Sequence, residues 1–391
     1  MSTLANVTVL PKDLWYFRDV LYRLLLTPVF AAAFALCVAE GALRLIDAVR
    51  DPDVSNRFVI GRVDPTAAPL TNRLRNRLGY FPLPAGSTSY HEILVNGKLD
   101  HSATYTIDPL GHRICAACPH PSHPRQTLTT LGCSFTFGQL VNDDETLAAR
   151  LQLLLPDTKV TNLGVLGFGP HQILPLITEF PTGVQPAASN TTIYVWMDDH
   201  IDRAIGNAVY FTWHPVRSPY WDWGPHGLEE RGTFQDRITN SNREFATFLF
   251  SKLLMTSALA RHLSGELPFR NRDRKENWEK VAQLIQQIQE ASRGPLSSSR
   301  FAVVFFPGSR WGRKRLIPLL SNRGIQTLDY SQLFNGEPVE KFQIPHDTHP
   351  NALAYQRVAE QLAKDLSSAS LGPDREVTQW SSQKTQRPSK G

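Results

Sequence analysis

The stretch QTLTTLGCSFTFG, residues 126–138, decides the fold. Its first half, residues 127–131, is a short apolar run typical of a buried strand. Ser134 follows directly in a turn with small neighbours. A serine at the carboxyl end of a strand can present its hydroxyl at the edge of a sheet, and its own N–H can serve an oxyanion. Ser134 is therefore a candidate nucleophile, and the alternative is a serine that only caps the turn.

Outward from this stretch, short apolar runs alternate with amphipathic helical patterns. Further strands are expected at residues 159–163, 192–197, 301–306 and 325–328. Helices are expected at 171–180, 243–263, 275–291 and 352–366, with one more that uses Asp143 or Asp144 as its N-cap. This alternation predicts an α/β fold with a parallel sheet covered by helices on both faces. Substrates of such folds bind outside the carboxyl ends of the strands.

Two more motifs stand at predicted strand ends or helix starts. Residues 161–170, TNLGVLGFGP, follow the second strand, and their glycines let backbone N–H groups approach a ligand, although they could serve only the turn. Residues 345–351, PHDTHPN, come directly before the last helix. Asp347 and His349 in this loop are a candidate orienter and general base.

These motifs resemble a known family. The runs GCSFTFG at 132–138 and VNDDET at 141–146 resemble the nucleophile block of the SGNH (GDSL-type) hydrolases. NLGVLGFG at 162–169 is similar to their second block, DTHPN at 347–351 to their last, and IDPLGHR at 107–113 to the lead-in of membrane-anchored members. The resemblance implies a flavodoxin-like three-layer α/β/α sandwich over residues 126–366 that hydrolyses or transfers ester-linked acyl groups.

The resemblance also implies roles for single residues. Ser134 would be the nucleophile, His349 the general base and Asp347 its orienter. The backbone N–H groups of Ser134 and Gly167 would supply two of the three oxyanion-hole donors.

Two departures from the family pattern concern the site. The third block, YVWMDDHIDR at 194–203, lacks the family's Asn, and Asp199 or His200 stands there. A histidine can donate a hydrogen bond whereas an ionised aspartate cannot, so His200 is the better candidate for the third oxyanion donor. Asp347 also stands two residues before His349, where the commonest family spacing is three.

The N-terminus carries a long apolar segment. Residues 24–39, LLLTPVFAAAFALCVA, hold no charge, and with their flanks up to residue 46 they reach the roughly 20 residues that span a bilayer. Lys12, Arg18 and Arg23 precede the segment, which favours a cytoplasmic N-terminus. We expect a cytoplasmic segment at 1–23, one transmembrane anchor at 24–46, and a catalytic domain outside the cytoplasm, periplasmic or extracellular. A cleaved signal peptide and a buried core helix are the alternatives.

Three segments flank or interrupt the predicted sandwich. Residues 47–125 are rich in Pro, Asn and Arg and are expected to form an irregular stalk with a lead-in hairpin. Residues 201–242 carry many aromatic side chains. They form either a satellite core or a wall at which Trp213 and Trp221 contact substrate. Residues 367–391 have few large apolar side chains and are expected to be a disordered tail.

The charge and the cysteine pattern bear on two further classes, nucleic-acid-binding proteins and zinc proteins. The net charge of +5 over 391 residues, without a long basic block, argues against a nucleic-acid partner. Cys115 and Cys118 form a C-x-x-C pair followed by His120 and His123, a spacing that fits no common zinc finger. A metal site, a disulfide and unpaired thiols remain open, with unpaired thiols favoured. No metal or other cofactor is expected.

The leading hypothesis is a membrane-anchored serine esterase that works through an acyl-Ser134 intermediate. The anchor and the aromatic segment suggest an ester-bearing substrate in the envelope or outside the cell, such as an O-acylated glycan. An acyltransferase, with a sugar hydroxyl in place of water, is one alternative. The other is a binding or assembly protein that keeps the fold without activity, which the missing Asn supports. The sequence makes no prediction of oligomeric state.

Overall fold

The structure is a computed structural model that describes residues 12–50, 52–115, 124–185, 187–207, 210–212, 216–264 and 272–368. Its centre is a five-stranded parallel sheet of order β10-β9-β6-β4-β5. The strands are β4 (Gln126–Gly132), β5 (Thr158–Gly164), β6 (Ser189–Trp196), β9 (Arg300–Phe305) and β10 (Gln326–Asp329). Counted from β4, this is the 2-1-3-4-5 order of flavodoxin-like sheets. The predicted α/β class with a parallel sheet is confirmed.

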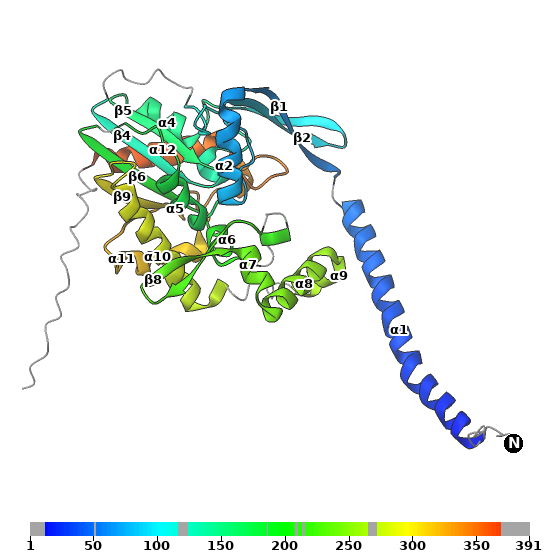
Figure 1. The fold of residues 1–391 in the computed structure, drawn as a ribbon. Helices are drawn as coiled ribbons and strands as arrows, with labels where there is room; N and C mark the ends of the chain where they lie inside the picture. The colour runs from blue at the N-terminus through cyan, green and yellow to red at the C-terminus, as the bar shows by residue number, and fades with distance from the viewer. Residues whose placement is uncertain are drawn as a thin grey trace, which may run out of the picture.

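Helices cover both faces of this sheet (Figure 1). α4 (Leu147–Leu154) and α12 (Ala352–Ser367) pack together on one face, and α5 (Pro170–Glu179) and α10 (Lys275–Ser292) on the other. In β6, Ile193 points to the first face and Tyr194 to the second. Because both faces are buried, the strands read as apolar runs rather than as polar–apolar alternations.

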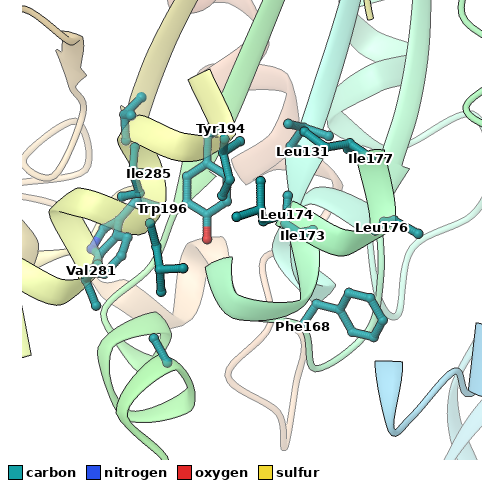
Figure 2. Close-up of a cluster of buried hydrophobic side chains, with 14 of the residues drawn as sticks. Leu131, Phe168, Ile173, Leu174, Leu176, Ile177, Tyr194, Trp196, Val281 and Ile285 are labelled. Atoms are coloured by element: carbon teal, nitrogen blue, oxygen red, sulfur yellow. The ribbon is translucent and has the colours of Figure 1, made fainter. Parts of the chain in front are cut away.

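Figure 2 shows the larger core, where strand side chains meet those of α5 and α10. Leu131, Tyr194 and Trp196 come from the sheet, Ile173 and Ile177 from α5, and Val281 and Ile285 from α10. All of these side chains are buried. Burying one large apolar side chain contributes about 1.5–3 kcal/mol, so this layer fixes the carboxyl ends of β4 and β6 relative to each other.

The region before the sheet differs from the expected irregular stalk. It forms an antiparallel sheet of β1 (Val54–Val63), β2 (Ser87–Val95) and β3 (Lys98–Thr106), with α2 (Ala68–Leu78) between β1 and β2. The expected hairpin is present as β2–β3, where Asn96 and Gly97 have φ values of 51° and 74°, the left-handed pair that tight hairpins favour. Leu74 and Leu78 of α2 belong to the main core. Their stripe is narrow and lies among Arg and Asn residues, which is why the sequence suggested turns.

The described part of the aromatic segment forms a satellite core rather than a wall of the substrate site. It contains α6 (Asp199–Ile205), η2 (Tyr210–Thr212), β7 (Pro219–Gly224), β8 (Gly227–Thr233) and α7 (Phe234–Thr239). Tyr210, Phe211 and Phe234 are buried against one another. The helix predicted at 243–263 is split into α8 (Asn242–Thr256) and α9 (Ala258–Ser264).

The N-terminal helix α1 (Lys12–Arg50) stands away from the sandwich (Figure 1). Its stretch Leu26–Arg50 has a mean hydropathy of 1.9 and is long and apolar enough to cross a membrane. The remaining short helices are η1 (Pro65–Ala67), α3 (Ser134–Phe137), η4 (Gly312–Leu316), α11 (Ile317–Ser321) and η5 (Val339–Phe342). The predicted tail beyond Ser368 lies outside the described residues.

Candidate active site

Ser134 stands at a sharp turn between β4 and α3. Gly132 has a φ of 153°, and a Cβ there would lie 2.2 Å from the Thr136 Oγ1 atom, so a side chain would not fit. Cys133 is extended and buried, and Ser134 opens the helix. β4 lies between β5 and β6, where the strand order reverses. The nucleophile candidate therefore sits where flavodoxin-like sheets bind their ligands.

The structure brings the three expected catalytic side chains within hydrogen-bond distance of one another. The Oγ atom of Ser134 lies 2.9 Å from Nε2 of His349, and Nδ1 of His349 lies 2.5 Å from Oδ1 of Asp347. The same Oδ1 atom accepts the backbone N–H of His349 at 2.7 Å. A hydroxyl, an imidazole and a carboxylate in this order can activate the hydroxyl as a nucleophile.

The charge of Asp347 fixes the role of the imidazole. Burial raises the pKa of Asp347, but the hydrogen bonds and charge of His349 outweigh burial, so the pKa lies below its ordinary value. The carboxylate is thus ionised and accepts the proton on Nδ1, which leaves Nε2 to accept the proton of Ser134. This tautomer is assigned from the hydrogen bonds. The ring of Phe135 packs 5.5 Å from the imidazole and helps to hold it.

The two expected backbone donors of the oxyanion hole lie at the start of α3 and in the loop after β5. Within the described residues, neither the Ser134 N–H nor the Gly167 N–H donates to a backbone carbonyl. The loop is held from behind, because Arg203 Nη1 donates to the Phe168 carbonyl at 2.9 Å and Tyr210 Oη to the Gly167 carbonyl at 3.3 Å. Arg203 and Tyr210 were not singled out from the sequence, where they are one cation and one aromatic among many.

His200, the expected third donor, lies elsewhere. Its side chain is fully buried, and Nδ1 is 3.0 Å from the Tyr194 hydroxyl. The ring packs edge-on against Trp196 at 5.3 Å. Burial, followed by the charges of Arg203 and His171, holds the pKa of His200 well below its ordinary value. The first turn of α6 directs this histidine into the core beneath β6, so it forms no part of the hollow beside the triad.

The two carboxylates before His200 do line that hollow. Asp199 is more than half exposed, and its Oδ2 atom lies 3.8 Å from Nη2 of Arg203. Asp198, which the sequence argument overlooked, accepts the backbone N–H groups of Trp311 and Gly312, each at 2.8 Å. Burial raises the pKa of Asp198 despite these bonds. The available signal was two consecutive carboxylates after a buried strand, of which only the second was considered.

The hollow beside the triad has a volume of about 470 Å³, which is in the range of small-molecule sites. Phe135 and Thr348, the neighbours of Ser134 and His349, form one side of it. Met197, Asp198 and Asp199 form another.

Of the two tryptophans expected to contact substrate, Trp221 lies away from the hollow beside the triad. Trp221 donates from Nε1 to the His171 carbonyl at 3.1 Å and packs against the main core instead of lining the hollow. Its place in the β7–β8 hairpin, on the α5 side of the sheet, explains this position. Trp213 lies outside the described residues.

No metal centre is present among the residues that the structure describes. Cys115 is buried, and burial raises the pKa of its thiol to about 12. Cys118, His120 and His123 lie outside the described ranges, so the prediction for the C-x-x-C pair stays a prediction.

A buried arginine that the sequence argument did not identify supports the nucleophile turn. Arg113 donates from Nη1 to the Phe137 carbonyl at 3.2 Å and also to the Gly138 carbonyl. Its Nε atom pairs with Asp143 at 2.9 Å. Asp143 is therefore not the N-cap of α4, a role that Thr146 fills. In the sequence, the only signal for Arg113 was its place in the lead-in run at 107–113, to which no chemical role was assigned.

Comparison with known proteins gives fold-level similarity alone. No protein-family model matches the chain, and no curated protein matches it in sequence. Similar solved structures include a member of the lipolytic G-D-S-L family from Veillonella parvula DSM 2008, at 10% identity and a TM-score of 0.35, over 61% of this chain and 97% of that one. A family two carbohydrate esterase from Clostridium thermocellum, in complex with cellohexaose, has 9% identity and a TM-score of 0.36, over 64% and 66%.

A third similar structure is a salicylyl-acyltransferase from a tetracycline biosynthetic pathway, with 12% identity and a TM-score of 0.35 over 83% of this chain and 97% of that one. All three structures have TM-scores below 0.5 and identities of 9–12%. At this level of similarity they carry no argument about substrate or activity. The case for function therefore rests on the geometry of Ser134, His349 and Asp347.

Proposed function

We propose that this protein is a serine esterase that cleaves an ester-linked acyl group through an acyl-Ser134 intermediate. The observation that supports the proposal most directly is the chain of hydrogen-bond contacts from Ser134 Oγ through His349 to Asp347. Its position at the switch point of the sheet, beside a hollow that can hold a small ester, is the second support.

In the first half of the reaction, Ser134 Oγ attacks the ester carbonyl carbon while His349 Nε2 takes the hydroxyl proton. Negative charge moves to the carbonyl oxygen, which the N–H groups of Ser134 and Gly167 stabilise. The imidazolium is stabilised by the ionised Asp347. The bond to the alcohol oxygen then breaks, and His349 returns its proton to that oxygen. In the second half, water attacks the acyl-enzyme by the same route and releases the acid.

The proposed place of action is the outer side of a membrane. The apolar stretch of α1 is long enough to span a bilayer, and Lys12, Arg18 and Arg23 precede it in the sequence. The proposed substrate is an acylated glycan or another ester-bearing molecule of the envelope or the outside of the cell.

The test is ester hydrolysis by the full chain and by Ser134→Ala. Wild type should hydrolyse p-nitrophenyl acetate and react with a fluorophosphonate probe, and Ser134→Ala should do neither while its circular dichroism is unchanged. Ser102→Ala, at an exposed serine of β3, is the matched control and should behave as wild type. Equal turnover by wild type and Ser134→Ala would refute the proposal, and analysis of products with a sugar acceptor would identify an acyltransferase instead.

A further inference from the structure

A second hollow of about 620 Å³ opens beside the catalytic one. It is lined by Arg310, Arg313, Lys314, Ser331, Gln332 and Asn335. We call this hollow the cationic groove. It shares Arg310, Ser331 and Asn335 with the hollow beside the triad, so the two are continuous.

The cationic groove carries uncompensated positive charge. Among the described residues, no acid lines it, and of its three cations only Arg313 is paired, with Asp329 at 2.9 Å. Within the described residues, neither Arg310 nor Lys314 has an acidic partner, although both are exposed.

The acids of the adjoining hollow are already engaged. Asp198 accepts two backbone N–H groups, and Asp199 faces Arg203 at 3.8 Å. Glu337 pairs with Lys341 and lies 3.5 Å from Arg357. Of these acids, Asp199 and Glu337 already face cations of their own, whereas Asp198 is held by neutral N–H groups.

The segment that carries the cations is held firmly in place. The carboxylate of Asp198 binds the N–H groups of Trp311 and Gly312. Gly312 packs so closely that a Cβ there would lie 2.2 Å from Nε1 of Trp196. The following turn, η4, is a π-helix, a form frequent at functional sites. Because the backbone of the turn is already fixed, binding an anion has to order only the side chains of these cations.

From these observations we propose that the cationic groove binds an anionic group, a carboxylate or a phosphate, on the substrate whose ester lies at Ser134. This proposal rests on the proposed esterase function. Arginine matches both groups with paired N–H donors, and lysine adds a point charge. The substrate class is thus an acylated anionic glycan or a comparable acylated anion.

The test compares three O-acetylated oligosaccharides, one neutral, one bearing uronate carboxylates and one bearing phosphates. Wild type should show a lower KM for the two anionic substrates than for the neutral one. Whichever anionic substrate has the lower KM identifies the anion that the groove prefers. In R310Q/K314Q the KM for that substrate should rise about tenfold with kcat unchanged. The difference in KM between wild type and R310Q/K314Q should shrink as the salt concentration increases. Arg315→Gln is the matched control, because Arg315 is exposed on the same turn and does not line the groove.

An unchanged KM in R310Q/K314Q would overturn the groove proposal while leaving the esterase intact. If wild type hydrolyses neither these three substrates nor p-nitrophenyl acetate, the esterase proposal falls. Equilibrium binding of the deacetylated uronate and phosphate oligosaccharides to Ser134→Ala, with and without R310Q/K314Q, then tests the groove by itself. Equal binding by the two forms would refute it.

Helix α8 exposes three large apolar side chains to the surface. In α8 the side chains of Phe245, Leu249 and Phe250 are 53%, 50% and 62% exposed. Phe245 and Leu249 stand one turn apart on the same side of the helix, and Phe250 lies about 100° further round. Three large apolar side chains together on a surface helix are unfavourable in water and indicate an interaction surface.

The junction of α8 and α9 is tied to α1. The carboxylate of Glu40 accepts the N–H groups of Ala258 at 2.9 Å and Leu259 at 2.8 Å. Arg44 donates to the Thr256 carbonyl at 2.7 Å. Both contacts come from Leu26–Arg50, the stretch of α1 that can cross a membrane, and Figure 1 shows α9 beside it.

We infer that α8 lies along the surface of the bilayer that holds α1, with Phe245, Leu249 and Phe250 in the lipid. Amphipathic helices bind bilayers in this way, and their basic side chains extend to the headgroups. Lys252 of α8, whose Nζ lies 5.3 Å from the Phe248 ring, is placed to do so.

The test uses the full chain in phosphatidylcholine nanodiscs. A spin label on Leu249→Cys, in a Cys37→Ser background, should be accessible to oxygen and shielded from a water-soluble nickel reagent. A label on Val339→Cys, at an apolar position that is 55% exposed in η5, should be open to nickel. Equal nickel access at the two positions would refute the membrane contact.

Discussion

Asp347 reaches the imidazole of His349 although it stands only two residues before it. Its Oδ1 atom accepts both the backbone N–H and the Nδ1–H of His349, which folds residues 347–349 into an Asx turn. His346 has a φ of 58°, an uncommon value for a non-glycine residue, and begins this turn. The short spacing therefore does not weaken the orienting role, because the turn supplies what the longer family spacing would.

His200 and Asp199 should affect different properties of the protein. His200→Ala leaves the buried Tyr194 hydroxyl unpaired and should lower the free energy of unfolding by about 1–3 kcal/mol, with kcat nearly unchanged in the folded protein. Asp199→Asn removes a negative charge from the hollow and adds a donor, and should raise kcat. Denaturant unfolding and steady-state kinetics of the two variants check this. A hundredfold loss of kcat in His200→Ala would show that His200 is the oxyanion donor after all.

His91 should make stability depend on pH. It is buried in β2, with Nδ1 3.1 Å from the Tyr105 hydroxyl. Burial lowers its pKa to about 4, against the opposing charge of Asp347, with His349 and His101 adding to the decrease. Between pH 6.5 and about 4 the unfolded chain binds the proton that the folded chain refuses, so stability falls as pH falls, by up to about 3 kcal/mol from this residue.

His91→Gln removes that titration. The difference in free energy of unfolding between wild type and this variant should therefore narrow as pH falls from 7 to 4. Urea unfolding at several pH values measures it, and parallel curves would show that His91 does not contribute.

The positions of site residues that stand at chain turns could be predicted from the sequence. The direction of a side chain on a packed helix could not. Ser134, Asp347 and His349 each stand where a strand ends or a helix begins, a position that short-range patterns reveal. The direction of His200 depends on how α6 packs under β6, which involves Tyr194 and Trp196 and leaves no local trace.

Among the elements, the turn after β4 depends on Arg113, which precedes the parallel sheet in the sequence. Arg113 donates to carbonyls of that turn, to the Thr104 carbonyl of β3 at 3.0 Å and to the Val141 carbonyl at 2.6 Å. One side chain thus connects the antiparallel sheet to the nucleophile turn.

Arg113→Met should lower the free energy of unfolding by about 3–5 kcal/mol, because it leaves Asp143 and several carbonyls buried without their partner. Arg113→Lys keeps the charge but loses the several N–H donors of the guanidinium. Its free energy of unfolding should lie between those of wild type and Arg113→Met. Thermal unfolding of the three proteins ranks them. A loss below about 1 kcal/mol in Arg113→Met would mean that water replaces the guanidinium.

The five strands of the parallel sheet were predicted to within a few residues, because strands buried on both faces leave a clear apolar run. The division of the predicted helix 243–263 into α8 and α9 was not predicted. It depends on Glu40, whose carboxylate accepts the first N–H groups of α9 from more than 200 residues away in the sequence. Ser257 also caps α9, because its Oγ atom accepts the Ala260 N–H at 3.0 Å, so a serine inside the helical pattern was the local signal.

For the whole molecule, the antiparallel sheet and α2 belong to the same folded unit as the sandwich. Leu74, Leu78 and Phe81 are buried in the main core, and Ile93 lies in the core on the other face. Their removal would expose apolar surface on both sides of the central sheet.

The full chain and the chain without residues 1–51 should therefore both unfold cooperatively. The chain without residues 1–125 should bind a hydrophobic dye such as ANS and lose its cooperative transition. Scanning calorimetry and dye fluorescence compare the two. A cooperative transition in the shorter chain would restore the stalk interpretation.

The separation of Ser134 and His349 also has a consequence in time. They stand 215 residues apart, and a ribosome adds about 5–20 residues per second. Roughly 10–40 s therefore pass between synthesis of the nucleophile and synthesis of its base. Throughout that interval the growing chain carries a serine that nothing activates. On the proposed function, a chain cut short before His349 would lack the base and would be inert toward esters.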